Sequence, residues 1–180
     1  MKLSEWVENI SESSDRLSLG LSGKTKKKFA DRDSVSNLDF DFVDLGLPSG
    51  NLWCKHNYGA KSESDLGKYF TYSEALALPL DCGKVPSVED LVDLCDGCKT
   101  EFTSSGGTIG VRFFSKTNGN SIFLPVEENG YAIYLSSSMK DKRNANCLFL
   151  GRGTHRVNPK DYFLEVSSRK HALRVVCNFN

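Results

Sequence analysis

The alternation of apolar and polar positions changes early in the chain, and this change predicts where a folded domain begins. Val43, Leu45 and Leu47 alternate with polar or small residues, which is the period of a strand with one buried face. Residues 48–51, Pro-Ser-Gly-Asn, can turn the chain because proline presets its backbone and glycine accepts positive φ. The apolar pattern then resumes. We therefore predict a strand, a tight turn and a second short strand that brings Trp53 into a core.

Two later segments have the spacing of short helices. Residues 88–95 follow Ser87, which can cap a helix, and Asp90 stands where a capping box needs an acidic partner. Gly97 ends this predicted helix, and residues 73–78 predict a second, shorter one. The apolar stripe of the longer helix comprises Val88, Leu91, Val92 and Cys95.

The rest of the chain has the pattern of β structure. The apolar runs 108–114 and 121–125 flank Asn118-Gly119, a dipeptide that favours a hairpin. Short helices followed by antiparallel strands make the expected fold class α+β. Further strands are predicted at 131–135, 147–150, 162–166 and 173–177.

The first 41 residues are more polar and more weakly patterned. Leu17, Leu19 and Leu21 alternate with small polar residues and could form an added strand. We interpret residues 1–41 as an N-terminal anchoring arm and 42–180 as the folded domain. A short amphipathic helix is the candidate anchor, and because so short a helix is marginal alone, we expect it to form against a partner surface. Its apolar stripe comprises Leu3, Trp6, Val7 and Ile10.

The charge balance argues against two classes of partner. Lys+Arg 23 equals Asp+Glu 23, so no net charge attracts the chain to nucleic acid or to an anionic membrane. The sequence has no apolar run long enough to span a membrane, and its N-terminus lacks the apolar core of a signal peptide. Lysines at 24–28 leave two interpretations, a solvated linker or a local contact to phosphate or nucleic acid. We expect neither membrane insertion nor nucleic-acid binding.

Cys95 and Cys98 have the spacing of a zinc knuckle or a redox pair. A knuckle needs a second pair, and the other cysteines are scattered singly. A redox pair would open a helix, whereas these two close one. We favour a helix-end cysteine packed in the core over both alternatives, and we expect thiols rather than disulfides.

No residue pattern supports catalysis. Residues 20–25 resemble a phosphate loop, but their glycine spacing fails. His56, His155 and His171 lie far apart, and the serines at 136–138 lack the flanking glycines of a hydrolase elbow. We expect a protein that is not an enzyme and that uses no cofactor and no metal ion.

Loops between the late strands are rich in long polar side chains. If these loops converge, they form a basic, donor-rich face suited to glycans, phosphates or an acidic protein partner. The alternative is that they are polar only because they face solvent. The candidate ligand-binding residues are Lys140, Lys142, Arg143, Asn144, Arg152, His155, Arg156 and Arg169.

Six short motifs occur in order along the chain. The first is Val-Asp-Leu-Gly-Leu-Pro-Ser-Gly-Asn-Leu-Trp at 43–53. The others lie at 65–70, 85–91, 118–125, 134–138 and 173–176. Together they resemble the Fibrobacter succinogenes major paralogous domain, a family found in Bacteroidetes and their phages.

This resemblance implies a C-type-lectin-like fold whose first and last strands lie side by side, and a role in display or binding. Tyr134-Leu135 and His171-Ala172 depart from the family pattern. The chain has no Glu-Pro-Asn or Trp-Asn-Asp triplet for a calcium-dependent sugar site. Enzymes of the related sulfatase-modifying fold would need a reactive cysteine pair.

Together, the resemblance and the arm lead us to expect a structural protein of a phage virion. In this hypothesis the arm docks on another virion protein of the capsid or tail, as in a decoration protein or head fibre. The domain then faces a host-surface glycan or protein, and the chain can self-associate into a homo-oligomer. The alternative is a bacterial cell-surface carbohydrate-binding module.

Overall fold

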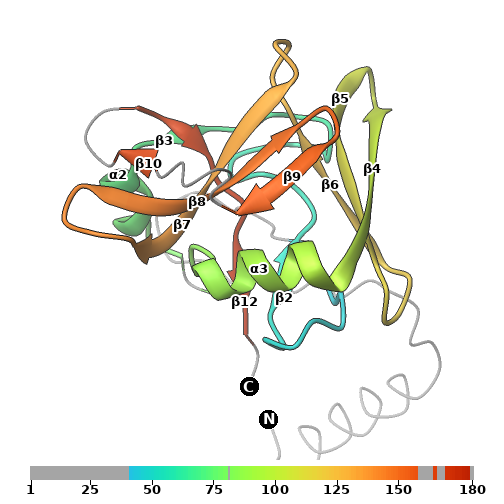
Figure 1. Cartoon of the computed structure of the whole chain (residues 1–180), viewed down its shortest axis with the longest axis horizontal. Helices are drawn as coiled ribbons and strands as arrows, with labels where there is room; N and C mark the ends of the chain where they lie inside the picture. The colour runs from blue at the N-terminus through green and yellow to red at the C-terminus, as the bar shows by residue number, and fades with distance from the viewer. Residues whose placement is uncertain (1–40, 81, 158–163, 166–168, 179–180) are drawn as a thin grey trace, which may run out of the picture.

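A computed structural model of the chain describes residues 41–80, 82–157, 164–165 and 169–178 (Figure 1). The candidate anchor at Leu3, Trp6, Val7 and Ile10 lies outside the described residues, as do the predicted strand at 17–21 and part of the one at 162–166. Those interpretations therefore stay predictions.

The described residues form three sheets and two short helices, which confirms the α+β class in its coarse form. One sheet has the order β1-β2-β12 and comprises β1 (Phe42–Val43), β2 (Leu52–Cys54) and β12 (Val176–Cys177). A second has the order β4-β5-β6 and comprises β4 (Cys98–Ser105), β5 (Thr108–Ser115) and β6 (Ser121–Pro125). The largest has the order β10-β8-β7-β11-β3, with β9 also paired to β8. Its strands are β3 (Tyr69–Phe70), β7 (Tyr131–Met139), β8 (Asn144–Gly151), β9 (Thr154–Val157), β10 (Leu164–Glu165) and β11 (His171–Ala172).

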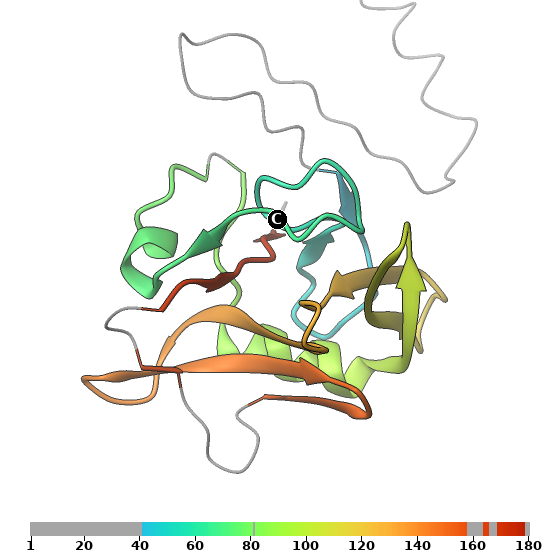
Figure 2. The ribbon, with the colours of Figure 1, turned by 90° about the horizontal axis from the view of Figure 1, so that it is seen from above.

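The helices are α2 (Tyr72–Leu76) and α3 (Val88–Gly97). Figure 2 shows α3 along one face of the largest sheet, where it contacts β7, β8 and β9. Among the described residues, no helix is long and apolar enough to cross a membrane.

The predicted strand, turn and strand at the start of the domain are confirmed, with a shorter first strand. The Asp44 carboxylate accepts the Gly46 N–H at 2.6 Å, and Gly46 has a φ of 59°, so the extended run ends early. The turn closes where the Gly50 N–H donates to the Leu47 carbonyl at 2.9 Å. Trp53 follows on β2 and is 0% exposed, as expected of a core residue.

The N-terminus of α3 is as predicted, whereas its apolar stripe is confirmed only in part, at Leu91 and Cys95. Ser87 caps the helix and Asp90 completes the capping box. Val92, placed in the apolar stripe, is 39% exposed, and the buried helix residues are Asp90, Leu91 and Leu94. The helix is turned this way because the Asp90 carboxylate also accepts a hydrogen bond from Asn51 Nδ2 at 2.5 Å, which requires it to face inward.

The predicted hairpin of β5 and β6 is confirmed, and it has a third strand that the sequence pattern did not indicate. β4 pairs with β5 along its whole length, from Cys98 opposite Ser115 to Ser105 opposite Thr108. Gly106 and Gly107 both have positive φ, which fits the tight turn between the two strands. Cys98 therefore begins a strand where we expected only the end of a helix.

The last described segment runs between two hydrophobic clusters. Val176 belongs to the cluster around Trp53, whereas Leu173 and Val175 belong to a second one. Both faces of this segment are buried, so it has no solvent-facing side. β12 pairs with β2, and β2 separates it from β1. The last strand thus lies beside Trp53 on β2, and not beside the first strand, β1, as the resemblance implied.

Candidate binding surface

The predicted ligand residues lie in groups at different places on the largest sheet. Lys140, Lys142, Arg143 and Asn144 belong to the hairpin between β7 and β8. The residues at 152–156 belong to the hairpin between β8 and β9, at the other end of β8. At about 3.4 Å per residue, the two ends of β8 are roughly 24 Å apart. Arg169 precedes β11, which is separated from β8 by β7. The structure therefore does not bring the whole set together.

Within the first hairpin, Asn144 serves the turn itself. The Asp141 carboxylate accepts hydrogen bonds from the backbone N–H groups of Arg143 and Asn144 and from Asn144 Nδ2, at 2.8–3.0 Å. These bonds lower the pKa of Asp141, and the bond from the Asn144 side chain has the largest effect. Lys142 and Arg143 remain exposed.

His155 is likewise engaged within the domain. Its ring nitrogens lie 3.2 and 3.3 Å from the Thr100 hydroxyl, and its ring packs edge-on against Phe113 with centroids 6.0 Å apart. Burial, followed by the charge of Arg156, lowers the pKa of His155. The imidazole thus joins β9 to the β4-β5-β6 sheet.

An aromatic pair, of which Tyr131 is exposed and Phe149 is half-buried, lies beside the arginines of the second hairpin. Tyr131 is 52% exposed, and its ring contacts that of Phe149 with centroids 5.6 Å apart and an interplanar angle of 40°. It also covers Gly151, where a Cβ would lie 2.7 Å from Tyr131 Cδ1. Arg156 is opposite Phe149 in the ladder and therefore on the same face of the sheet. We call Tyr131, Phe149, Arg152 and Arg156 the Tyr131 surface.

The Tyr131 surface combines two recognition chemistries. The aromatic rings offer apolar faces of the kind that pack against a flat ligand, and both arginines are exposed and carry planar fork donors suited to carboxylate or phosphate. Sequence reasoning found the arginines but missed Tyr131 and Phe149. The alternation of Tyr131, Ile133 and Leu135 resembles a buried face, whereas Ala132 and Tyr134 are the neighbours that enter the main cluster.

No family model, no curated protein and no solved structure matches this chain. Any assignment of function therefore depends on the residues and on their geometry.

The main buried polar group of the domain is Arg174, which sequence reasoning did not single out. It is 1% exposed and donates from Nε to Asn57 Oδ1 at 3.0 Å, from Nη1 to the Cys54 carbonyl at 2.9 Å and from Nη2 to the Phe123 carbonyl at 2.7 Å. All of these acceptors are uncharged. Burial lowers the pKa of Arg174 more than the nearby hydroxyl and thiol raise it.

Tyr134 extends this network. Its hydroxyl donates to the Pro125 carbonyl at 2.8 Å and accepts from Asn57 Nδ2 at 3.1 Å. Asn57 Nδ2 also donates to the Leu66 carbonyl at 3.0 Å. Burial raises the pKa of the Tyr134 hydroxyl, and the charge of Arg174 acts against this. The network thus joins the closing segment to β2, to the loop after it, to β6 and to β7.

Two further titratable groups in the interior, Tyr69 and His171, lie near the Glu127 carboxylate. The Tyr69 hydroxyl and His171 Nε2 are buried without a hydrogen-bond partner among the described residues. Burial, assisted by the Glu127 carboxylate, raises the pKa of Tyr69, and burial lowers the pKa of His171. Each group is thereby held in its neutral form.

The Cys95 and Cys98 thiols are also held neutral. Burial raises the pKa of Cys95 to about 12 and that of Cys98 to about 11. A thiolate is the form that attacks disulfides and binds metals. In the part of the chain that the structure describes, no group of three or more His, Cys, Asp or Glu residues could hold a metal ion.

Proposed function

We propose that this chain is a non-enzymatic structural protein of a phage virion. Residues 1–41 attach it to another virion protein of the capsid or tail, and residues 42–180 form a C-type-lectin-like domain that is displayed outward. The observation that carries this proposal is the position of the domain's first strand. β1 begins at Phe42 in the sheet that also holds β12, on the lower side of the domain in Figure 1, and the hairpins β4–β5 and β6–β7 project from the upper side. This supports the proposal, because an attachment that continues from β1 and a surface formed by these hairpins would lie on opposite sides of the domain.

The arrangement of strands supports the lectin-like part of the proposal. The resemblance implies that the two ends of the domain meet, and they share one sheet, although β12 pairs with the second strand, β2, and not with β1. Two short helices accompanied by antiparallel strands are also what the resemblance implies, and the sheets are antiparallel except where β11 pairs with β7 in parallel. The hydrogen bonds of the buried polar groups favour display over catalysis, since Arg174, Asn57 and Tyr134 bond to one another and to the backbone inside the core.

Deletion of the arm tests the proposal. Particles produced with a chain lacking residues 1–40 should lose this protein, because the attachment segment is absent while the domain begins at Phe42. A matched pair within the arm sharpens the test. Leu3→Ala with Trp6→Ala should reduce occupancy on purified particles, and Glu5→Ala with Glu8→Ala, on the other face of the expected helix, should not. Full occupancy of the particles by a chain that lacks residues 1–40 would contradict the proposal.

The Tyr131 surface favours the second candidate, a bacterial cell-surface carbohydrate-binding module. A glycan array with the full chain should then show binding that is lost on Tyr131→Ala and on Arg152→Ala with Arg156→Ala. Lys142→Ala with Arg143→Ala is the matched control, since it removes equal charge at the other end of β8. If the control and test variants lose binding equally, the Tyr131 surface is not the site.

A further inference from the structure

β4 is a long strand with one paired edge and one open edge. β5 occupies one side along all eight residues of β4, and no described strand pairs with the other side. In Figures 1 and 2, β4 is the outermost strand of its sheet. An open edge of this length can accept another strand through its backbone hydrogen bonds.

The ladder shows which backbone groups face the open edge. The Lys116 N–H donates to the Gly97 carbonyl at 2.9 Å, so these two residues form a hydrogen-bonded pair. In an antiparallel ladder such pairs alternate, and every second residue of β4 after Gly97 is therefore hydrogen-bonded to β5. The N–H and C=O groups of the intervening residues, Thr100, Phe102 and Ser104, therefore point away from β5. Along the other edge of β5, the Ser115 N–H donates to the Asn120 carbonyl at 2.8 Å. Ser115 therefore points its backbone groups away from β4, as the same alternation requires.

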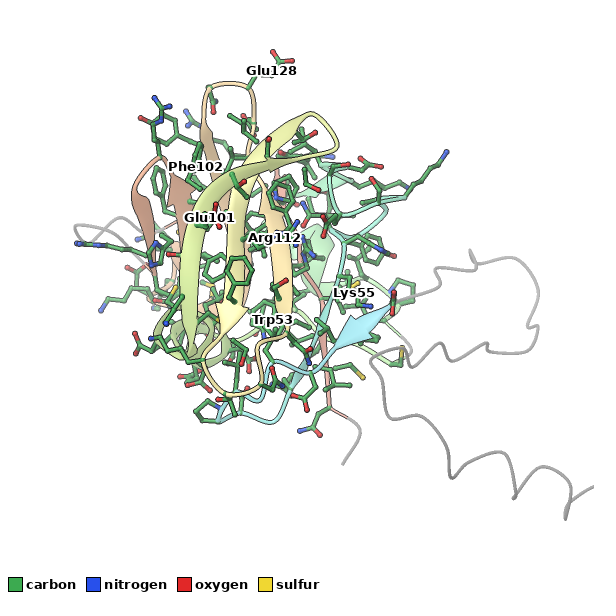
Figure 3. All side chains as sticks on the ribbon, turned by 90° about the vertical axis from the view of Figure 1, so that its right-hand side faces the viewer. Trp53, Lys55, Glu101, Phe102, Arg112 and Glu128 are labelled. Atoms are coloured by element: carbon green, nitrogen blue, oxygen red, sulfur yellow. The ribbon has the colours of Figure 1, made fainter. Side chains whose placement is uncertain are left out.

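The charges beside these groups select a partner. Lys99 and Glu101 are both exposed, and the register places them on the face of β4 that carries Arg112 on β5. Figure 3 labels Glu101 and Arg112. If two copies of β4 pair in antiparallel orientation about an axis at Thr100, Lys99 lies opposite Glu101 of the partner subunit, and the reverse pair forms by symmetry. β4 is thus complementary in charge to itself.

Neighbouring registers lack this complementarity. An axis at Glu101 would place two carboxylates opposite each other, which is unfavourable. An axis at Phe102 would place Lys99 opposite Ser105 and Glu101 opposite Thr103, so neither charge would meet its opposite. The axis at Thr100 also uses the outward backbone groups of Thr100 itself.

We propose that two copies of this chain associate through the open edges of β4, with Thr100 at the two-fold axis and Lys99 opposite the partner's Glu101. This contact goes beyond attachment and display, and it does not depend on them. Because it consists of one strand pair and exposed ion pairs, it is weak in solution and gains strength where many copies are held close together.

The association can be measured by sedimentation of the full chain at concentrations up to roughly 1 mM, the range in which weak interfaces form. Lys99→Glu and Glu101→Lys should each weaken the dimer by roughly tenfold or more, because each change replaces both ion pairs with like charges. The double variant Lys99→Glu/Glu101→Lys should return to within about threefold of the original chain, since the complementarity is restored.

A backbone pair of variants tests the edge independently of charge. Thr100→Pro removes an N–H that points away from β5, so it should abolish the dimer without breaking the β4–β5 ladder. Thr100→Val keeps that N–H and should still dimerise. A chain that is monomeric throughout the concentration range overturns the proposal. So does a dimer that tolerates Thr100→Pro, or one that the double charge variant fails to restore.

Discussion

Arg174 Nε donates a hydrogen bond of 3.0 Å to Asn57 Oδ1, although the two residues are 117 positions apart in the chain. The same guanidinium reaches the carbonyls of Cys54 and Phe123, so one side chain from the closing segment is bonded to β2, to the loop after it and to β6. A charge buried among neutral acceptors is costly to desolvate, and it is tolerated because every bond has good geometry. The stability of the domain should therefore be sensitive to substitution of Arg174.

Arg174→Lys should destabilise the domain by about 2–4 kcal/mol, even though it retains the charge. A single ammonium cannot reach all the acceptors that the guanidinium spans, and each buried acceptor left unpaired costs about 1–3 kcal/mol. Urea denaturation would measure the loss. Arg156→Lys, at an exposed position, is the control and should change the free energy of unfolding by less than about 0.5 kcal/mol. Equal effects from the two variants would mean that the buried network does not stabilise the domain.

Two tyrosines three positions apart should respond differently to loss of the hydroxyl. Tyr134→Phe removes the bonds to Pro125 and Asn57 and should cost about 1–2 kcal/mol. Tyr131→Phe removes an exposed hydroxyl and should be nearly neutral. The two substitutions are chemically identical, so the difference in urea midpoint reports the environment alone. No difference would contradict the buried position of the Tyr134 hydroxyl.

The pairing of Glu63 with Arg112 should make stability depend on pH. Arg112 Nη2 donates to Glu63 Oε1 at 2.7 Å, and the Ser105 hydroxyl donates to the same oxygen at 2.6 Å. The hydrogen bond from Arg112 is the main cause that holds the pKa of Glu63 below its usual value of 4.5. Its stabilisation is therefore complete above the pKa of the unfolded chain and is lost as the pH falls through the lower pKa of the folded state.

Comparison of the original chain with Glu63→Gln tests this dependence. The original chain should be the more stable at about pH 7, and the gap should narrow as the pH falls below 4.5, the usual pKa of the carboxyl. The Glu63 side chain is 39% exposed, so solvent screening keeps the effect modest. Glu128→Gln, at the tip of the β6–β7 hairpin in Figure 3, is the matched control, since it makes the same change at a side chain that projects from the domain. A gap that widened on acidification would contradict the sign of the pKa shift.

The thiols of Cys95 and Cys98 should be almost inert in the folded protein. Against the ordinary thiol pKa of 9.0, the values of about 12 and about 11 reduce the thiolate fraction by roughly a thousandfold and a hundredfold. Alkylation by iodoacetamide, followed by mass spectrometry of the two peptides, would measure the rates. Both should rise to ordinary values in urea. Fast alkylation of Cys95 in the folded chain would instead support the alternative of a reactive cysteine pair.

Local signals in the sequence predicted the local structure well. Ser87 and Asp90 marked the start of α3, and Asn118-Gly119 marked the β5–β6 hairpin, because capping and turn chemistry depend on neighbouring residues. The sequence pattern did not predict β4, because its residues, Cys-Lys-Thr-Glu-Phe-Thr-Ser-Ser, include few apolar ones. Its position is set by β5, with which it pairs, and not by its own pattern.

The polar network could not be predicted, because its members are distant in the chain. Arg174 lies among Leu173, Val175 and Val176, where alternation places an arginine on a solvent-facing side. That inference fails since both faces of the segment are buried. The candidate surface was predicted in part: the arginines of 152–156 stood out by charge, whereas Tyr131 looks like any core aromatic until the packing of Gly151 beneath it is known.

The position of the closing segment in the core also has a consequence for folding. Residues 172–177 supply Ala172 and Val176 to one core cluster and Leu173 and Val175 to the other. Neither cluster is complete until this segment has joined β2, and the carbonyl partners of Arg174 lack their donor until then. The two clusters therefore form together in one cooperative step, and a chain that lacks this segment has neither.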